Sequence, residues 1–165
     1  MTDIVLIAHN LRSTHNVGSL LRTAEGLSLK KVILSGYTPY PLSENDDRLP
    51  HISQKIDRQI AKTALGAETM IDWQHTIDLE ATINNLKAEG YVVAGLEQSA
   101  ASIKLNDYRS PAKVALILGR EVYGIEPEIM TLCDLLLEIP MYGKKESFNV
   151  VQAAAMALYQ LRVLG

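Results

Sequence analysis

A short loop around residue 143 combines glycine, lysine, carboxylate, hydroxyl and amide groups within a few positions. In the segment IPMYGKKESFNV, residues 139–150, a proline ends an apolar run and a helical, alanine-rich pattern follows. Gly143 and Ser147 alone would supply the turn and the helix cap of an ordinary strand-to-helix connection. The two lysines, Glu146 and Asn149 exceed that need, so the loop is a candidate ligand site.

A second candidate segment is NVGSLLRTAEG, residues 16–26. A helix starting near Asn16 would place Gly18, Arg22 and Gly26 on one stripe, so that Arg22 is flanked by bare backbone. Together with Asn16, Arg22 would then face a ligand crevice. The alternative is structural: Gly18 would permit close helix packing, Gly26 would cap the helix, and Arg22 would be a solvated surface charge.

The third segment is GREVYGIEPE, residues 119–128, which directly follows an apolar run. Glu121 could be an ordinary acidic residue at a helix N-terminus, where the helix dipole contributes roughly 0.3 to 1 kcal/mol. However, Gly119 and Gly124 remove side chains on both sides of Glu121, as a site requires when backbone amides contact a ligand. Both interpretations remain open at this point.

Several common sites do not fit these segments. A dinucleotide fingerprint needs clustered glycines, and the first turn offers only Gly18. The glycine spacing of a P-loop is present, but Ile125 and Glu126 stand where it needs lysine and a hydroxyl residue. Ser147 lacks the glycines of a hydrolase elbow. No histidine has a cysteine or carboxylate at ligand spacing, so we expect no metal site.

The elements that must position these residues can be read from the hydropathy pattern. Apolar runs predict strands at 3–8, 30–36, 68–73, 91–97, 113–119 and 135–140, and helical spacing predicts helices at 16–27, 53–67, 78–90 and 149–164. Nearly continuous apolar strands that alternate with helices indicate an α/β fold, in which helices cover both faces of a parallel sheet. The predicted ligand edge is the one at the carboxyl ends of the strands, where the three segments begin.

Composition limits the class of protein. The 165 residues fit one domain, 1–165, with 47% hydrophobic residues and a net charge of −3. A nucleic-acid partner would therefore need a local basic patch. Cys133 is the only cysteine, and no apolar run approaches the ~20 residues of a membrane span. We expect a soluble, cytoplasmic protein without a membrane partner. The last helix is apolar on several faces, which predicts burial or a shared dimer interface.

The segments NVGSLLR, LILGREVYGI and IPMYGKKESFNVVQAAAMALYQ, in this order and at these strand ends, resemble the three motifs of the SpoU (TrmH-like) RNA 2′-O-ribose methyltransferases of the SPOUT superfamily. The resemblance spans nearly the whole chain, and three motifs at the right strand ends are highly specific. One departure is Phe148, where many relatives have leucine.

The resemblance implies a deep C-terminal trefoil knot, a homodimer and S-adenosylmethionine as methyl donor, with no metal. Many relatives carry an added RNA-binding domain, but the match leaves no segment of this sequence for one, so we expect a single methyltransferase domain. We expect it to act on transfer RNA in preference to ribosomal RNA. Carried over by position, the cofactor-binding residues are Leu96, Glu97, Gly119, Ile139, Met141, Phe148 and Asn149.

The catalytic residues implied by the resemblance are Arg22, Asn16, Glu121, Ser147 and Asn149. A ribose hydroxyl is a poor nucleophile, so the enzyme must align it with the methyl group and help to remove its proton. Family proposals make the arginine at the position of Arg22 the base. Because its free pKa exceeds 12, a clamp that holds a phosphate is an equally good role.

A basic stripe supports an RNA partner. Lys55, Arg58 and Lys62 recur at helical spacing, and Arg12 adds charge near the first motif. The isoleucines at 52, 56 and 60 would pack on the sheet. A solvated amphipathic helix is the simpler interpretation of the stripe alone. Two other functions remain as alternatives: a non-catalytic RNA-binding module, and a small-molecule α/β enzyme.

Overall fold

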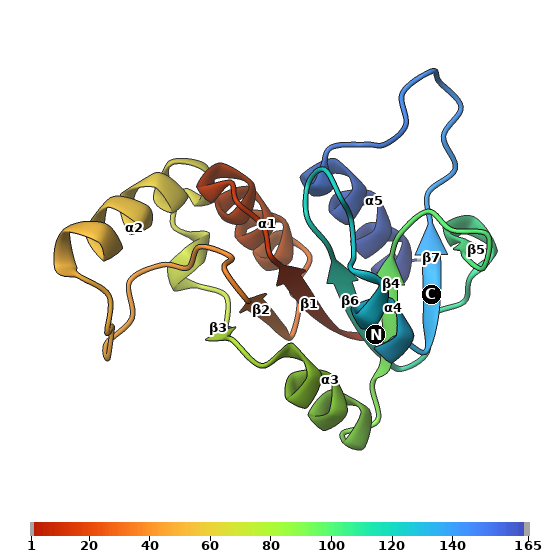
Figure 1. Ribbon diagram of the computed structural model, residues 1–165, viewed down its shortest axis with the longest axis horizontal. Coiled ribbons are helices and arrows are strands. Elements are labelled where there is room, and N and C mark those ends of the chain that lie inside the picture. Colours follow the sequence, from red (N-terminus) through yellow and green to blue (C-terminus); the bar gives the residue numbers. More distant parts are fainter. Residues whose placement is uncertain (1, 164–165) are drawn as a thin grey trace.

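The computed structural model describes residues 2–163, which form one layered α/β unit (Figure 1). The strands are β1 (Asp3–His9), β2 (Lys31–Ser35), β3 (Trp73–Thr76), β4 (Val92–Leu96), β5 (Ile103–Lys104), β6 (Lys113–Leu118) and β7 (Leu135–Glu138). The helices are α1 (Thr14–Gly26), α2 (Pro50–Ala64), α3 (Leu79–Ala88), α4 (Pro127–Leu132) and α5 (Val150–Val163), with short 3-10 turns at Ala67–Thr69 and Leu105–Asp107.

The strands of the described chain form one parallel sheet in the order β3-β2-β1-β6-β4-β7-β5. β6 pairs with β1 over six residues, from Asp3 with Lys113 to Ala8 with Leu118, and on its other edge it pairs with β4. The chain after β1 runs outward to β2 and β3, whereas β4, β7 and β5 lie beyond β6. Strand order therefore changes direction around β1 and β6, which is where α/β sheets bind ligands.

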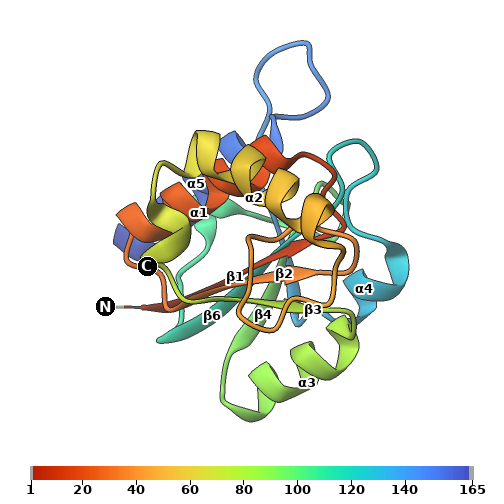
Figure 2. The same cartoon turned by 90° about the vertical axis from the view of Figure 1, so that its left-hand side faces the viewer.

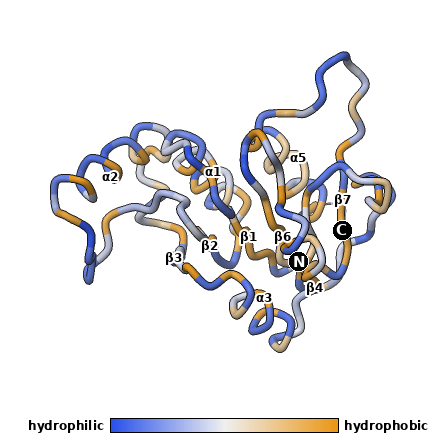
Figure 3. Tube along the Cα trace, viewed as in Figure 1, coloured by the Kyte–Doolittle hydropathy of each residue, from blue (hydrophilic) through white to orange (hydrophobic). Residues whose placement is uncertain are grey.

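Helices cover both faces of the sheet, as expected for a parallel sheet. Alternate residues of β1 divide between two apolar clusters: Ile4 and Leu6 pack with α1 and α5, while Val5 and Ile7 pack with α3 and α4. Figure 2 shows α1, α2 and α5 on one side and α3 and α4 on the other. In Figure 3 the central strands β1 and β6 are apolar and the outer helix α2 carries more polar positions. The predicted parallel sheet with helices on both faces is confirmed.

Two expectations about elements were wrong, and one open alternative is excluded. The run at 68–73 is not a strand, because the chain makes a 3-10 turn there and β3 begins at Trp73. The isoleucines of α2 pack mainly against α1 and not on the sheet as expected: Ile60 is buried there, Ile56 is partly buried in the same apolar cluster, and Ile52 is 41% exposed. Helix α4 begins at Pro127, so Glu121 lies in the preceding loop and is not a helix N-terminal residue.

The end of the chain is tied back to its beginning. The guanidinium of Arg162, in the last turn of α5, donates to the carbonyl of Thr2 at 2.6 Å, to that of Leu27 at 2.8 Å and to that of Ser28. These acceptors lie before β1 and just after α1, so α5 is fixed along the same layer as α1. No helix within residues 2–163 is both long and apolar enough to cross a membrane.

Candidate active site

A cleft of about 280 Å³ opens at the carboxyl ends of β4, β6 and β7. The loops that follow these strands line it, together with the first turns of α5. Seven residues that the sequence marked as candidates meet in this cleft: Leu96, Glu97, Gly119, Glu121, Ile139, Ser147 and Phe148. The candidate segments 119–128 and 139–150 thus form two walls of one site.

Close backbone packing shapes the wall after β6. The amide of Arg120 donates to the carbonyl of Gly124 and the amide of Gly124 donates back to the carbonyl of Arg120, both at 2.9 Å. A Cβ on Gly119 would lie 2.3 Å from the carbonyl carbon of Gly124, and Gly124 itself has φ of +69°. Both glycines are therefore required by this tight turn. It brings the backbone of residues 119–124 to the cleft.

Glu97, just after β4, fixes that turn. Its carboxylate accepts the amide of Ile125 at 2.8 Å and the amide of Gln98 at 2.9 Å. The Gln98 side chain reaches across and donates to the carbonyl of Glu146 at 3.0 Å. The β4 loop therefore connects the two walls of the cleft. Sequence reasoning missed Gln98, which has no distinctive spacing.

Glu121 joins the β6 loop to the start of α1. Its carboxylate accepts the backbone amides of Arg12 and Ser13 at 3.1 Å, and the Asn16 side-chain amide at 3.4 Å. Burial alone would raise the pKa of Glu121, but these hydrogen bonds, together with one from its own backbone, outweigh burial and lower it. Asn16, the N-terminal residue of the candidate segment 16–26, is thereby held beside the cleft.

Three other candidates do not line the cleft. Asn149 caps α5, since its side-chain oxygen accepts the amide of Val151 at 2.9 Å. For an ordinary strand-to-helix connection, the sequence had predicted Ser147 as this cap. Met141 is partly buried in the loop between β7 and α5. Arg22 is exposed on α1, and within residues 2–163 it makes no hydrogen bond or ion pair.

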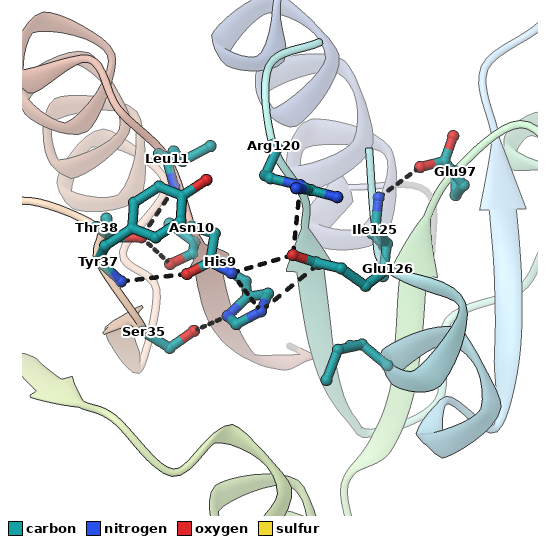
Figure 4. A network of polar contacts seen from close by, with 12 residues as sticks. His9, Asn10, Leu11, Ser35, Tyr37, Thr38, Glu97, Arg120, Ile125 and Glu126 are labelled. Carbon is teal, nitrogen blue, oxygen red and sulfur yellow. Dashed lines mark hydrogen bonds and ion pairs between the residues drawn. The ribbon is translucent and has the colours of Figure 1, made fainter. Parts of the chain in front are cut away.

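A polar network underlies the β6 loop at the ends of β1 and β2 (Figure 4). The ring of His9 contacts the Ser35 hydroxyl at 2.7 Å through Nδ1, and its Nε2 lies 3.6 Å from Glu126 Oε2. Asn10 donates to Glu126 at 3.0 Å and accepts the Tyr37 amide at 3.1 Å. It has φ of 55°, a left-handed conformation that asparagine tolerates better than most residues.

Burial and neighbouring charges act on the pKa values of His9 and Glu126 in this network. Burial lowers the pKa of His9, although Glu126 opposes this effect, and Arg120 adds to the lowering. Burial alone would raise the pKa of Glu126, but the Asn10 hydrogen bond and the nearby His9 and Arg120 lower it. The Arg120 Nε lies 3.3 Å from Glu126. The contacts of His9, Asn10 and Arg120 with Glu126 thus link the β6 loop to the end of β1.

These network residues were not among the sequence candidates. Their positions in the sequence could have identified them: His9 and Asn10 directly follow the apolar run 3–8, and Arg120 directly follows Gly119. The basic residues of the predicted stripe, Lys55, Arg58 and Lys62, are all exposed on α2, and Arg12 is exposed before α1. Within residues 2–163, no three His, Cys, Asp or Glu side chains gather as a metal site would require.

The chain matches a known protein family. The model of the SpoU rRNA Methylase family matches residues 3–159. A protein of Staphylococcus haemolyticus, named for the TrmH family of tRNA/rRNA methyltransferases, is 31% identical over 160 residues. The match covers 95% of this chain but 57% of that relative, so the chain spans little more than half the length of the relative.

Solved structures show the same fold. An AdoMet-bound rRNA methyltransferase from Sinorhizobium meliloti superposes with a TM-score of 0.80 at 21% identity, covering 96% of this chain and 55% of that one. A protein described as an RNA 2′-O ribose methyltransferase superposes with a TM-score of 0.77 at 20% identity, covering 96% of this chain and 55% of the other.

Proposed function

Because this chain belongs to the SpoU rRNA methylase family, we propose that it transfers a methyl group from S-adenosylmethionine to a ribose 2′-hydroxyl of RNA. The observation that carries the proposal is the cleft itself, in which two of the three family-like segments form facing walls while Glu121 draws in the third. The description of a structural neighbour as a 2′-O ribose methyltransferase supports the choice of acceptor atom.

The chemistry of the cleft fits the proposed cofactor. Its walls offer apolar side chains for an adenine, including Leu96, Ile139 and Phe148, and the bare backbone around Gly119 and Gly124. S-adenosylmethionine carries a sulfonium and an ammonium cation, and four carboxylates line the cleft: Glu97, Glu121, Glu138 and Glu146. Bound there, the cofactor would supply an electrophilic methyl group.

The residues of this chain would do the remaining work by alignment. We assign Asn16, Glu121 and Ser147 to the position of the ribose, because Asn16 contacts Glu121, and Glu121 and Ser147 line the same cleft. Arg22 would hold a phosphate of the RNA from its exposed place on α1, since a guanidinium matches phosphate oxygens in pairs. Asn149 would fix the third loop as the cap of α5.

The acceptor is tested with RNA from cells that lack the gene and with cofactor that carries a labelled methyl group. We take transfer RNA as the first acceptor and ribosomal RNA as the second; the S. haemolyticus relative is named for both. A 2′-O-methyl group prevents alkaline cleavage at that nucleotide, so we expect the label in alkali-resistant dinucleotides. Label on a base would overturn the ribose assignment, and RNA binding without transfer would favour a binding module.

We also infer that the C-terminal segment is knotted, as family resemblance implies. The supporting feature is the return of the chain after β7, through the loop 139–149, to pack α5 along α1 and β1 (Figure 1). Single-molecule pulling on the two ends tests this. A knotted chain stays shorter than the ~3.3 to 3.6 Å per residue of a fully extended one, and a chain that reaches full extension is unknotted.

A further inference from the structure

The tip of the β6 loop presents two exposed apolar side chains at the rim of the cleft. Val122 is 82% exposed and Tyr123 is 72% exposed, yet both line the cleft. Apolar surface at the rim of a polar site marks a place where another molecule binds. The packing of the described chain does not account for these two side chains, because neither belongs to an apolar cluster.

Hydrogen bonds fix the tip of the β6 loop in this position. The reciprocal hydrogen bonds of Arg120 and Gly124 close a hairpin around the three residues of the tip, and the Glu97 carboxylate fixes the next amide at 2.8 Å. Within the tip, Glu121 is directed to the start of α1 by its contacts with the amides of residues 12 and 13. Tyr123 is thus displayed by a preorganised turn, which lowers the entropic cost of binding a ligand.

Arg120 backs the ring of Tyr123. Its guanidinium carbon lies 5.1 Å from the ring centroid, within the range of a cation–π contact. The same guanidinium is attracted to Glu126, which Asn10 fixes in turn (Figure 4). One side of the aromatic ring is therefore supported by a held cation, while the large exposed area of Tyr123 remains available to a second planar group.

We propose that Tyr123, backed by Arg120, is a platform on which the base of the target nucleotide stacks. The proposal rests on the proposed function and names its substrate class: a nucleotide with an unpaired, unstacked base, in a loop, bulge or strand end. Aromatic side chains bind such bases through their π-faces. A base inside an RNA helix has neighbours on both faces, so it has no face for Tyr123. The ribose attached to the stacked base would then enter the cleft.

The test uses the full chain, RNA from cells that lack the gene, and labelled methyl transfer. Tyr123→Leu removes the aromatic face while keeping apolar bulk, and we expect it to raise the KM for RNA about 5- to 150-fold, the range for loss of one base–aromatic contact. Tyr123→Phe retains the ring and should stay within about threefold of the unmodified chain. Ile77→Ala, at another residue that is 87% exposed, is the matched control and should leave KM unchanged.

Two further measurements separate the outcomes. Cofactor affinity by calorimetry should be the same in the Tyr123→Leu variant, and mapping should place the methylated nucleotide in an unpaired segment. No transfer by the unmodified chain would refute the proposed function. Transfer with an unchanged KM in Tyr123→Leu, or into a paired nucleotide, would overturn the platform alone. Lost cofactor affinity with unchanged KM for RNA would show that Tyr123 covers the cofactor instead.

Discussion

Glu121 has its carboxylate committed to hydrogen bonds with two backbone amides and the Asn16 side chain. A general base works best when its pKa lies near the working pH, and these bonds lower the pKa of Glu121 below its ordinary value. Glu121 is therefore poorly suited to take the proton of a hydroxyl group. Its contacts suit it to positioning, because they join the β6 loop to α1.

Arg22 is suited to contact RNA because it is exposed and has no partner within residues 2–163. We predict that Arg22→Ala abolishes methyl transfer and leaves cofactor affinity within a few-fold. Arg22→Lys should be nearly as damaging, since one ammonium cannot reproduce a paired grip on phosphate. Glu25→Ala, at an exposed charge on the same helix, serves as the control. Weakened cofactor binding in a folded Arg22→Ala variant would assign Arg22 a different role.

His9 predicts a pH dependence of stability. Its pKa in the folded chain lies below the ordinary 6.5, so the unfolded chain binds the proton more readily. The contribution of His9 is complete above pH 6.5 and is lost as the pH falls toward the folded-state pKa. The groups around its ring are Ser35, Asn10, Glu126 and Arg120.

The substitution His9→Gln tests this dependence because glutamine cannot titrate. Thermal unfolding midpoints between pH 7.5 and 5.5 should fall less steeply for the variant than for the unmodified chain. The comparison concerns the slope, so a uniform loss of stability in the variant does not affect it. Equal slopes would mean that His9 does not contribute to the pH dependence.

At the scale of single residues, the sequence predicted which residue types lie together in the cleft, but not which groups each one contacts. Glycine and polar residues at strand ends sufficed to mark Gly119, Glu121 and Ser147 for the site. The binding of Glu121 to amides of residues 12 and 13 joins positions more than one hundred residues apart, and no local pattern reports such a contact. The His9 network went unnoticed for the same reason.

At the scale of elements, α1 and α2 make the closest helix contact of the layer. A Cβ on Gly18 would lie 2.2 Å from both the Ile60 carbonyl oxygen and the Thr63 hydroxyl, which is far inside contact distance. We predict that Gly18→Ala destabilises the fold by roughly 1 to 3 kcal/mol or more, because backbone must shift. The measurement is urea unfolding.

Gly26→Ala is the matched control for that experiment, on the same helix. Nothing lies within 4 Å of its Cβ position and its φ is not positive. Alanine should therefore be neutral or stabilise by up to about 1 kcal/mol, through its better helix propensity. Equal effects of the two substitutions would show that α2 does not approach α1 as closely as described.

The basic stripe on α2 belongs to the same scale. Lys55, Arg58 and Lys62 are exposed, as the helical spacing predicted. If phosphates lie along the stripe, replacing all three by Gln should raise KM for RNA and flatten the salt dependence by about 0.7 to 0.9 logarithmic units per lost contact. Cofactor affinity should not change. An unaltered salt slope in the folded triple variant would place the RNA elsewhere.

Element prediction succeeded where apolar runs were long and failed where they were short. The strands β1, β4 and β6 are buried almost throughout, so their runs are unambiguous. Before β3, the run ETMIDW contains partly buried and exposed residues, and the chain makes a turn there before the strand begins. The orientation of α2 failed for a different reason: an amphipathic pattern reveals a buried face but not the element that covers it.

At the scale of the whole molecule, α5 leaves apolar side chains uncovered. Met156, Tyr159 and Val163 are 38%, 56% and 52% exposed, and Tyr142 and Phe148 line a groove that Tyr159 shares. We predict a homodimer through this face. Sedimentation at micromolar concentration should give about twice the chain mass of 18.2 kDa. Tyr159→Lys should shift it toward the monomer, and Met70→Lys, at a residue 71% exposed elsewhere, should not.

The position of β6 between β1 and β4 also governs how the molecule comes into being on the ribosome. β1 is synthesised first, yet one of its edges waits for a partner that emerges about a hundred residues later. Such distant pairing folds slowly, and an open strand edge invites association with other chains. The cleft needs still later residues, within the range 137–153. A nascent chain thus acquires its binding site only after these residues have been synthesised.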